Sequence, residues 1–323
     1  MAAKHYEDLP DYARDFLSYY ENILGKSPNT IRSYYSDLKL FFRFLITRDG
    51  KTASQDFDNV SVSELSIETI RKVRLSDFYD FMTFVGTSRS NSAYARARKT
   101  ACLRSFFKYL NTKSHLIDEN PTKELDSPKT RKSLPKYLSL QESKRLLSAI
   151  DGKFKERDFA IITLFLNCGM RLSELIGINL SDLKENTLTV IGKGNKERTV
   201  YLNKACLDAI NQYMKVRPRD GVIDRNALFL SQQKRRITPR MVENIVKKHL
   251  TVAGLDTEKY SPHKLRHTAA TLMHKYGEVD IRVLQEILGH ERLSTTEIYT
   301  HVDDEQLQSA IEQNPLARFT DSE

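Results

Sequence analysis

The side chains best suited to chemistry gather in the last third of the chain. His263 and Arg266 belong to the sequence HKLRH. His290 ends the sequence LGH, Tyr299 follows it closely, and Arg171 stands far upstream in GMRLSEL. Guanidinium groups bind phosphate oxygens in pairs, imidazoles transfer protons near neutral pH, and a tyrosine hydroxyl can act as a covalent nucleophile. In combination, these residue types indicate the attack of an oxygen on a phosphodiester.

Each candidate also has an ordinary structural explanation. Arg171 could pair with Glu174, which lies three residues later on a predicted helix. His263 and Arg266 would share one face of a helix near its N-terminus, which favours phosphate, whereas His267 could instead pack inward. A single tyrosine among the 15 of this chain usually packs or lies on the surface. The phosphodiester hypothesis therefore depends on the whole set rather than on any one member.

Two other kinds of site are not expected. His263 and His267 have the i, i+4 spacing of zinc sites, but Lys264 stands where a zincin carries glutamate. The segment Gly192–Lys196 lacks the GxxxxGK[ST] pattern and precedes a predicted strand rather than a helix. We therefore expect no metal, nucleotide or other cofactor. The glycine-rich segment instead predicts a hairpin tip whose lysines reach into a groove or donate a proton to a leaving oxygen.

The amino-acid composition indicates what kind of partner the protein binds and in which compartment it is found. The chain carries 51 Lys+Arg against 42 Asp+Glu, a formal net charge of +9. This excess favours a polyanion such as nucleic acid, although many soluble proteins are equally basic. Three cysteines without a CxxC spacing are typical of a reducing compartment and argue against a disulfide scaffold or a zinc ribbon. With neither a signal-peptide pattern nor a long apolar run, we expect a soluble, cytoplasmic protein without a membrane partner.

The first part of the chain predicts a compact helical domain over residues 1–126. Apolar residues at helical spacing predict helices over Thr30–Leu45, Leu75–Val85 and Ala93–Leu110, with a further aromatic pattern before them. The polar residues 48–66 predict a loop or a short insertion. The aromatic side chains could stack on bases, but packing in a core is the favoured explanation.

A basic segment with two prolines, residues 127–138, predicts an extended linker to a second domain over residues 139–323. Two β-rich runs, Thr187–Ile191 and Glu197–Leu202, predict a hairpin in this domain, and the apolar run Asp158–Cys168 predicts a buried helix. The expected fold class is therefore mainly α, with a small β-sheet in the C-terminal domain. Further helix starts are predicted at the capping pattern Ser139–Glu142, at Thr238-Pro239, at Ser261-Pro262, at Asp280 and at Ser294.

Five stretches, in this order, resemble the tyrosine recombinase and integrase family, and are most similar to the Xer-type bacterial recombinases. They are SPNTIRSYYSDLKLFFRFL, GMRLSELIGI, IGKGNKERTVYL, HKLRHTAATLM and LQEILGHERLSTTEIYTH. The resemblance covers essentially the whole chain. It implies a two-domain DNA clamp, in which an N-terminal core-binding (SAM-like) helical domain and a C-terminal α+β catalytic domain hold duplex DNA between them.

The same resemblance implies a role for each candidate. Tyr299 would attack a DNA phosphate, forming a 3′-phosphotyrosyl bond and releasing a 5′-hydroxyl. Arg171 and Arg266 would bind the non-bridging oxygens and stabilise the transition state. His263 and His290 would assist by proton transfer and hydrogen bonding. The expected reaction is site-specific recombination through a Holliday junction, the alternatives being relaxation by a type IB topoisomerase or DNA binding without cutting.

Basic residues elsewhere are expected to act on the same DNA. Lys193 would protonate the leaving 5′-oxygen, with Lys196 as the alternative. Other cations of the 93–110 helix and the linker could contact phosphates or the major groove, a solvated basic face being the alternative. These candidates are Arg96, Arg98, Lys99, Arg104, Lys108, Lys129, Arg131 and Lys132.

The resemblance also implies an assembly. The segment Asp304–Asn314 resembles a tail helix that packs into a neighbouring subunit, although it could pack on its own domain. The expected partner is double-stranded DNA with paired half-sites, bound by a homo- or hetero-tetramer, with a possible second recombinase or accessory protein on the nucleoid. The polar stretch 48–66 is longer than in the Xer pattern. Resolution of chromosome or plasmid dimers and integration or excision of a mobile element therefore both stay open.

Overall fold

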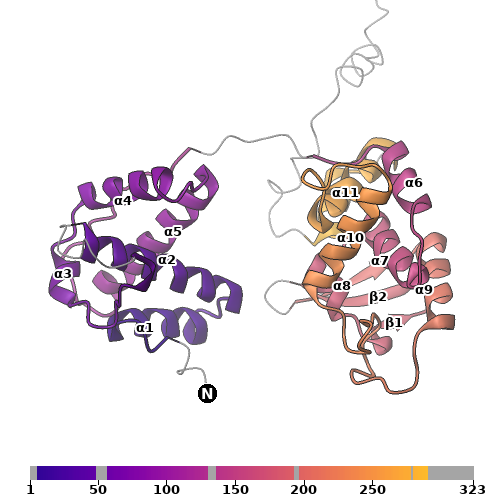
Figure 1. Ribbon diagram of the computed structural model, residues 1–323, viewed down its shortest axis with the longest axis horizontal. Helices are drawn as coiled ribbons and strands as arrows, with labels where there is room; N and C mark the ends of the chain where they lie inside the picture. Colours follow the sequence, from indigo (N-terminus) through magenta and orange to yellow (C-terminus); the bar gives the residue numbers. More distant parts are fainter. Residues whose placement is uncertain (1–5, 49–56, 130–135, 193–195, 278, 290–323) are drawn as a thin grey trace, which may run out of the picture. The chain divides into compact units, whose positions relative to one another are not determined.

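The structure is a computed structural model that describes residues 6–48, 57–129, 136–192, 196–277 and 279–289 (Figure 1). The chain divides into two compact units, Met1–Lys132 and Ser133–Glu323, here called the N-terminal and the C-terminal unit. The division falls inside the predicted linker, residues 127–138. Among the described residues, no helix combines the length and the apolar character needed to cross a bilayer.

All regular secondary structure described in the N-terminal unit is helical. Serine side chains begin three of its helices by accepting a backbone N–H, at Ser27, Ser66 and Ser92. The predicted helices of this region are all present, whereas the short third helix was not predicted. The elements are α1 (Asp11–Ser18), the π-helix η2 (Tyr19–Ile23), α2 (Pro28–Thr47), the 3₁₀ turn η3 (Phe57–Asn59), α3 (Ile67–Arg71), α4 (Leu75–Thr87) and α5 (Ala93–Thr112).

Aromatic rings fill the core of this unit. Phe41 on α2 stacks on Phe78 of α4 at 5.5 Å between ring centroids. Phe107 of α5 meets Phe78 edge-on at 5.2 Å, a favourable geometry for aromatic pairs. Phe16, Phe41 and Phe107 are fully buried. Core packing is therefore confirmed for these rings, which leaves none of them free to stack on bases.

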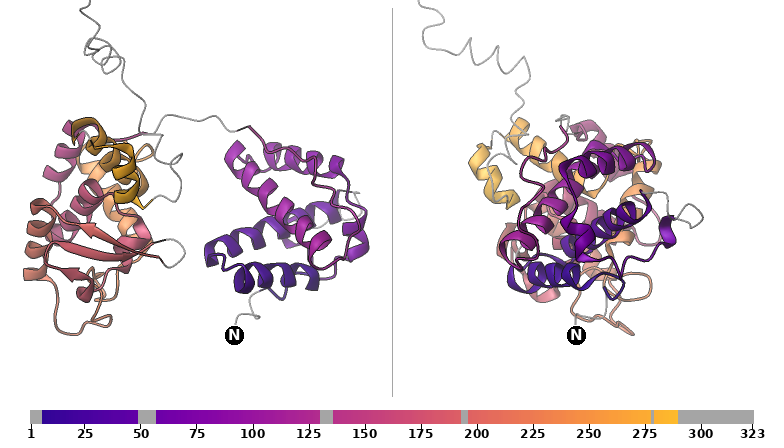
Figure 2. Two further views of the ribbon diagram at one scale, coloured as in Figure 1. Left: turned by 180° about the vertical axis from the view of Figure 1, so that it is seen from behind. Right: turned by 90° about the vertical axis from the view of Figure 1, so that its left-hand side faces the viewer.

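The C-terminal unit combines an antiparallel sheet of order β1-β2-β3 with helices. The prediction of a mainly helical chain with a small sheet is thus confirmed. Figure 2 shows from behind the three strands, in rose, as one small sheet beside the helices. The elements are α6 (Leu140–Ser148), α7 (Lys155–Cys168), α8 (Leu172–Gly177), the 3₁₀ turn η4 (Leu180–Asp182), β1 (Leu183–Lys184), β2 (Thr187–Ile191), β3 (Glu197–Tyr201), α9 (Lys204–Val216), α10 (Pro239–Val252), α11 (Pro262–Gly277) and α12 (Ile281–Leu288).

Local signals in the sequence set most of these boundaries. Ser139 and Glu142 exchange hydrogen bonds at the start of α6, as the capping pattern predicts. Thr238 caps α10 ahead of Pro239, and Asp280 caps α12. The predicted cap Ser294 lies outside the described residues.

The buried helix α7 lies at the centre of the unit and packs against α9 and α11. It begins three residues earlier than the apolar run predicts, because Arg157 and Asp158 are buried together in its first turn. The guanidinium of Arg157 binds the Asp158 carboxylate at 2.8 Å, so the charged pair enters the core without an unpaired charge. The C-terminal end of α7 leads directly into the segment that carries Arg171.

Candidate active site

A buried carboxylate, that of Glu174, lies at the centre of the candidate site. Glu174 belongs to the first turn of α8, and its side chain is 0% exposed. It accepts a hydrogen bond from the backbone N–H of Arg171 at 2.8 Å, which anchors the start of the helix. A carboxylate held away from water is strongly unfavourable unless cations and hydrogen-bond donors surround it.

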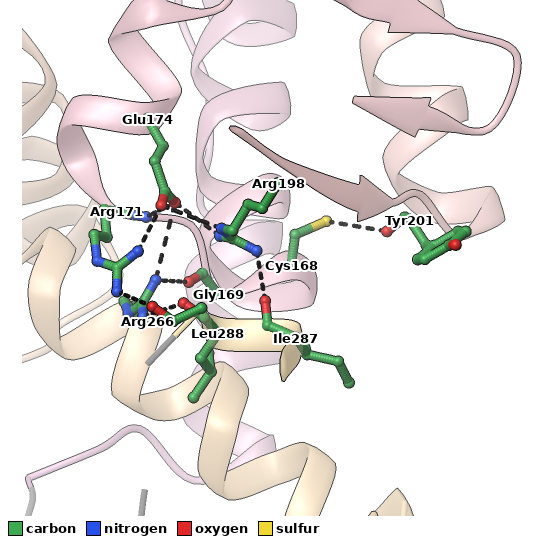
Figure 3. Close-up of polar contacts among 10 residues, drawn as sticks. Cys168, Gly169, Arg171, Glu174, Arg198, Tyr201, Arg266, Ile287 and Leu288 are labelled. Carbon is green, nitrogen blue, oxygen red and sulfur yellow. Dashed lines mark hydrogen bonds and ion pairs between the residues drawn. The ribbon is translucent and has the colours of Figure 1, made fainter. Parts of the chain in front are cut away.

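Three arginines supply those partners (Figure 3). Nη1 of Arg171 lies 2.7 Å from Oε1 of Glu174, and Nη2 of Arg198 lies 2.8 Å from Oε2. Nη1 of Arg266 is more distant, at 3.9 Å from Oε2. Burial acts to raise the pKa of Glu174, but the hydrogen bond and the charge of Arg198, followed by the backbone and side-chain hydrogen bonds of Arg171, outweigh it, and the pKa is lowered. Glu174 therefore stays ionised and holds the arginines from three separate elements together.

The same arginines bind the last carbonyl groups of α12. Arg198 donates to the carbonyl oxygen of Ile287 at 2.5 Å. Arg266 donates to that of Leu288, and Arg171 to that of Gly289, both at 2.6 Å. The carbonyl end of a helix carries partial negative charge and lacks partners within the helix, so cations are favoured there. Three consecutive carbonyls are thus fixed just before the segment with the remaining candidates.

Gly289 is required at this point for two reasons. Its φ of +63° is left-handed, which side chains rarely adopt, and it caps the C-terminus of α12. A Cβ placed on it would lie 2.8 Å from Cδ of Arg198. The glycine in LGH therefore lets the end of α12 lie against the arginine cluster.

Two histidines face each other on α11. The Nε2 atoms of His263 and His267 lie 3.0 Å apart, so one ring donates and the other accepts. His263 is exposed, yet the surrounding protein removes enough water to lower its pKa, and the positive charges of Lys264, Arg266 and Arg171 lower it further. His263 is consequently neutral near pH 7 and able to take up a proton. His267, for which inward packing was one possibility, contacts His263 instead.

The hairpin β2–β3 lies with its described base, including Lys196, at the edge of this cluster. The strands pair in register from Thr187 opposite Tyr201 to Ile191 opposite Glu197, which confirms the predicted hairpin. Lys196 is exposed at the base of the turn, where its carbonyl accepts a hydrogen bond from Gly192 N at 2.7 Å. A Cβ on Gly192 would lie 3.7 Å from Oε1 of Glu174, so the hairpin base lies close to the arginines.

Several predicted site residues cannot be placed by the structure. The described residues bring together Arg171, His263 and Arg266 on neighbouring elements with Glu174 and Arg198. The predicted residues that lie outside the described ranges are Lys193, His290 and Tyr299 of the site, Arg131 and Lys132 of the linker, and the tail segment 304–314.

One predicted DNA contact in the N-terminal unit needs correction. Lys99 is 6% exposed, and its Nζ lies 3.2 Å from Oδ1 of the buried Asp37. A lysine enclosed in this way ties α5 to α2 and is not available to a phosphate, so we leave Lys99 out of the proposed contacts. Arg98 also binds Asp37, at 2.6 Å, but remains exposed.

The other predicted contacts of this unit that the structure describes remain accessible. Lys108 and Lys129 are exposed. Arg104 is partly exposed and donates to the hydroxyl of Ser127 at 3.2 Å. Arg96 is partly exposed, with its guanidinium close to Gly86 of α4.

The sequence alone did not identify two members of the site. Glu174 was weighed only as a partner of Arg171. Arg198 was not considered, although the alternation of β3 places it on the same side as the buried Val200, with Glu197 and Thr199 on the other. An arginine on the inward side of a strand is a signal for a buried anion.

Comparison with known proteins agrees with this architecture. Residues 136–306 match the phage integrase family, and residues 13–114 match the phage integrase N-terminal SAM-like domain. The chain is 57% identical over 310 residues to tyrosine recombinase XerC of Caldanaerobacter subterraneus subsp. tengcongensis, covering 96% of this chain and 88% of the relative. It is 38% identical over 290 residues to tyrosine recombinase XerD of Proteus mirabilis, covering 88% and 86%.

The fold is similar to that of a crystal structure of the XerH site-specific recombinase bound to a palindromic difH substrate. The TM-score is 0.68 at 21% identity, covering 94% of each chain. The chain therefore belongs to the phage integrase family and is a tyrosine site-specific recombinase of the Xer type. A topoisomerase or a DNA-binding protein that does not cut is not favoured, because the relatives are recombinases.

Proposed function

We propose that Tyr299 is the nucleophile of this recombinase and that the arginines on Glu174 bind the phosphate it attacks. The Tyr299 oxygen forms a bond to phosphorus, the bond from phosphorus to the 5′-oxygen breaks, and a 3′-phosphotyrosyl linkage results. Arg171 and Arg266 stabilise the charge on the non-bridging oxygens. The observation that carries this proposal is the binding of both arginines to the last carbonyls of α12, a few residues before Tyr299.

Proton transfer falls to the histidines and a hairpin lysine in this proposal. The hydroxyl proton of Tyr299 passes to His263 or His290, and the lowered pKa of His263 leaves its ring neutral to accept it. The leaving 5′-oxygen takes a proton from Lys193, with Lys196 as the alternative. The phosphotyrosyl bond retains the energy of the broken linkage, so rejoining needs no nucleotide. A second strand exchange then resolves the Holliday junction.

Duplex DNA with paired half-sites is the proposed substrate. The XerH structure holds such a palindromic DNA, and we propose that the predicted DNA-contacting cations of this chain, Lys99 excepted, bind the phosphates of its own site. These cations are Arg96, Arg98, Arg104, Lys108, Lys129, Arg131, Lys132 and Lys196. Binding through them would weaken steeply with salt, because each phosphate contact releases counterions.

We also propose a tetramer on two DNA sites, with the 304–314 tail exchanged between subunits, acting in the cytoplasm on the nucleoid. The domain limits proposed for this clamp are residues 1–126 and 139–323. The same chemistry serves dimer resolution in chromosome partition and mobile-element integration or excision. A second recombinase or an accessory protein would set the order of strand exchange.

Trapping on a nicked suicide duplex tests the nucleophile. Cleavage of such a substrate releases a short fragment, so the covalent protein–DNA adduct accumulates. The wild type and Tyr201→Phe, a matched control at a tyrosine that is 77% exposed, should both form the adduct. Tyr299→Phe should form none. An adduct with Tyr299→Phe would refute the assignment.

Two further outcomes separate the alternatives. Exchange of strands between two labelled duplexes is expected of a recombinase, whereas relaxation of supercoils without exchange would indicate a topoisomerase. Binding of the cognate site without any adduct from the wild type would indicate a protein that does not cut.

A further inference from the structure

Arg198 is a largely buried arginine without an assigned role, and it connects the hairpin to the arginine site. It lies on β3, two residues after Lys196, and its side chain is 14% exposed. Its Nε and Nη2 bind the two carboxylate oxygens of Glu174 at 3.2 and 2.8 Å. Its Nη1 donates to the carbonyl oxygen of Ile287 at 2.5 Å. One guanidinium thus joins β3, α8 and α12.

This geometry differs from that of Arg171, the more exposed of the two arginines proposed to bind the phosphate. The other, Arg266, is itself 3% exposed and donates to the carbonyl oxygens of Gly169 and Leu288. All three nitrogens of the Arg198 guanidinium donate to protein groups, in the bidentate form that fixes orientation best. The Arg171 side chain, by contrast, is 29% exposed and binds Glu174 through Nη1 alone. Arg198 therefore supports the site from behind rather than receiving the phosphate.

The β2–β3 hairpin is held against the arginine site through Arg198. Gly192 at the end of β2 approaches Glu174 so closely that a Cβ would lie 3.7 Å from Oε1, and 3.8 Å from Nη1 of Arg171. Gly289 also approaches Arg198 closely, since a Cβ on it would lie 2.8 Å from Cδ of Arg198. The absence of side chains on these two glycines therefore lets the backbone approach the salt bridges around Glu174. Among the described residues of β3, Arg198 is the one that takes part in these salt bridges.

We propose that Arg198 is a positioning residue that sets the β2–β3 hairpin, and with it the proton-donating lysine, in register with the phosphate held by Arg171 and Arg266. The proposal rests on the function proposed above. A small displacement of a group that acts in the transition state lowers the rate strongly, about 10²-fold for ~1 Å. Loss of Arg198 should therefore act mainly on protonation of the leaving 5′-oxygen.

A change of leaving atom tests this directly. In a suicide duplex with sulfur in place of the bridging 5′-oxygen, the bond from phosphorus to sulfur breaks and a thiolate leaves. A thiol has a pKa of about 8.5 and leaves without help from an acid. Arg198→Ala should lower the single-turnover cleavage rate of the oxygen substrate about 10- to 100-fold at saturating DNA. On the sulfur substrate, its rate should come within a few-fold of the wild type.

Matched variants keep the result interpretable. Thr199→Ala changes the neighbouring exposed residue on the same strand and should cleave both substrates like the wild type. Alanine variants of Lys193 and Lys196 identify the acid, since the sulfur substrate should rescue only that one. Arg198→Lys keeps the charge but cannot bind both carboxylate oxygens and Ile287 at once, so it should fall between the wild type and Arg198→Ala.

Three results would overturn the proposal. The first is an equal loss on both substrates by Arg198→Ala or, if that variant does not fold, by Arg198→Lys. The second is wild-type cleavage of the oxygen substrate by Arg198→Ala. The third is rescue of neither lysine variant by sulfur. Failure of the function itself is distinct, because the wild type would then form no adduct, or Tyr299→Phe would still form one.

Discussion

Asp37 in the N-terminal unit and Glu174 in the C-terminal unit are both buried carboxylates with cationic partners, but their surroundings differ. Asp37, on α2, binds Arg98 at 2.6 Å and Lys99 at 3.2 Å. Glu174 binds two arginines closely, approaches a third, and accepts a backbone N–H. One carboxylate ties two helices together, whereas the other collects arginines from α8, β3 and α11.

The two carboxyl groups respond to burial in opposite directions. Burial raises the pKa of Asp37, and the charges of Lys99 and Arg98 do not outweigh it. Burial also acts to raise the pKa of Glu174, but the hydrogen bond and charge of Arg198 and the hydrogen bonds of Arg171 turn the net shift downward. The difference lies in the number of donors aimed at the anion rather than in the depth of burial.

This contrast separates a structural ion pair from a site prepared for a substrate. The arginines around Glu174 exceed it by two positive charges, and Arg171 is still 29% exposed. A phosphodiester, which carries one negative charge, offsets half of this excess. At Asp37, the buried Lys99 is enclosed by the fold, and only Arg98 reaches solvent.

The largest difference is expected when one arginine is removed from each carboxylate. Arg171→Ala should lower single-turnover adduct formation about 10²- to 10³-fold at saturating DNA, because a donor to the developing charge is lost. Arg98→Ala should leave this rate unchanged and raise the Kd for DNA. Equal losses of rate in the two variants would show that the groups around Glu174 and Asp37 do not differ in their role in cleavage.

Removing each carboxylate should affect stability unequally. Glu174→Gln leaves buried arginines without their counter-ion and should destabilise the C-terminal unit by about 3–5 kcal/mol. Asp37→Asn should affect the N-terminal unit less, because burial already disfavours the charged form of Asp37. Hydrogen exchange of α8 and α2 reports the two units separately. A greater loss of stability at α2 in Asp37→Asn than at α8 in Glu174→Gln would contradict this prediction.

The pH dependence of stability should have opposite signs in the two units. The lowered pKa of Glu174 means that its contribution is present above the pKa of an unfolded glutamate, about 4.3, and is lost as pH falls through the folded value. The raised pKa of Asp37 means that the folded unit binds more protons than the unfolded one. Its contribution is therefore largest at low pH and decreases as pH rises above about 3.9.

Measurement between pH 3 and pH 6 by hydrogen exchange would check these signs, with Glu174→Gln and Asp37→Asn as controls. Each control should remove the slope of its own unit and leave the other unchanged. Slopes of the same sign in both units would contradict the assignment of the two shifts.

The smallest expected effect is on stability and concerns the residues that cap one helix in each unit. Ser139 and Glu142 form a reciprocal capping box on α6, whereas Ser92 on α5 only accepts from Ala95 N at 3.3 Å. Ser139→Ala should cost about 1 kcal/mol and Ser92→Ala less, since only the first breaks a reciprocal pair. Urea unfolding followed by helix-specific hydrogen exchange measures both, and a larger cost at Ser92 would contradict this ranking.

The sequence predicted elements whose signals are local. Proline at a helix start marked α10 and α11, and two β-rich runs around glycines marked the hairpin, so both were found near their true bounds. The helical spacing from Tyr12 to Ile23 marked α1 and the turn after it, but not the π form of Tyr19–Ile23, and the short α3 was missed. Their form depends on packing against the rest of the N-terminal unit, and five-residue elements carry little periodicity of their own.

The candidate site was predictable in its residues but not in its organisation. The Arg171–Glu174 pair follows from i, i+3 spacing on one helix. Arg198 meets Glu174 across 24 residues and Ile287 across 89. Such contacts arise only from tertiary folding. The same limit applies to the lysines of α5. Lys99 and Lys108 look alike in sequence, but only Lys108 of the two faces solvent.

The most direct test of the account is to identify the residue that carries the DNA. The adduct trapped on a suicide duplex would be digested with protease and nuclease, and the nucleotide-linked peptide would be sequenced by mass spectrometry. The account predicts a 3′-phosphate attached to Tyr299, within the peptide that follows Arg292. A nucleotide attached to any other residue, or a peptide that persists in Tyr299→Phe, would contradict it.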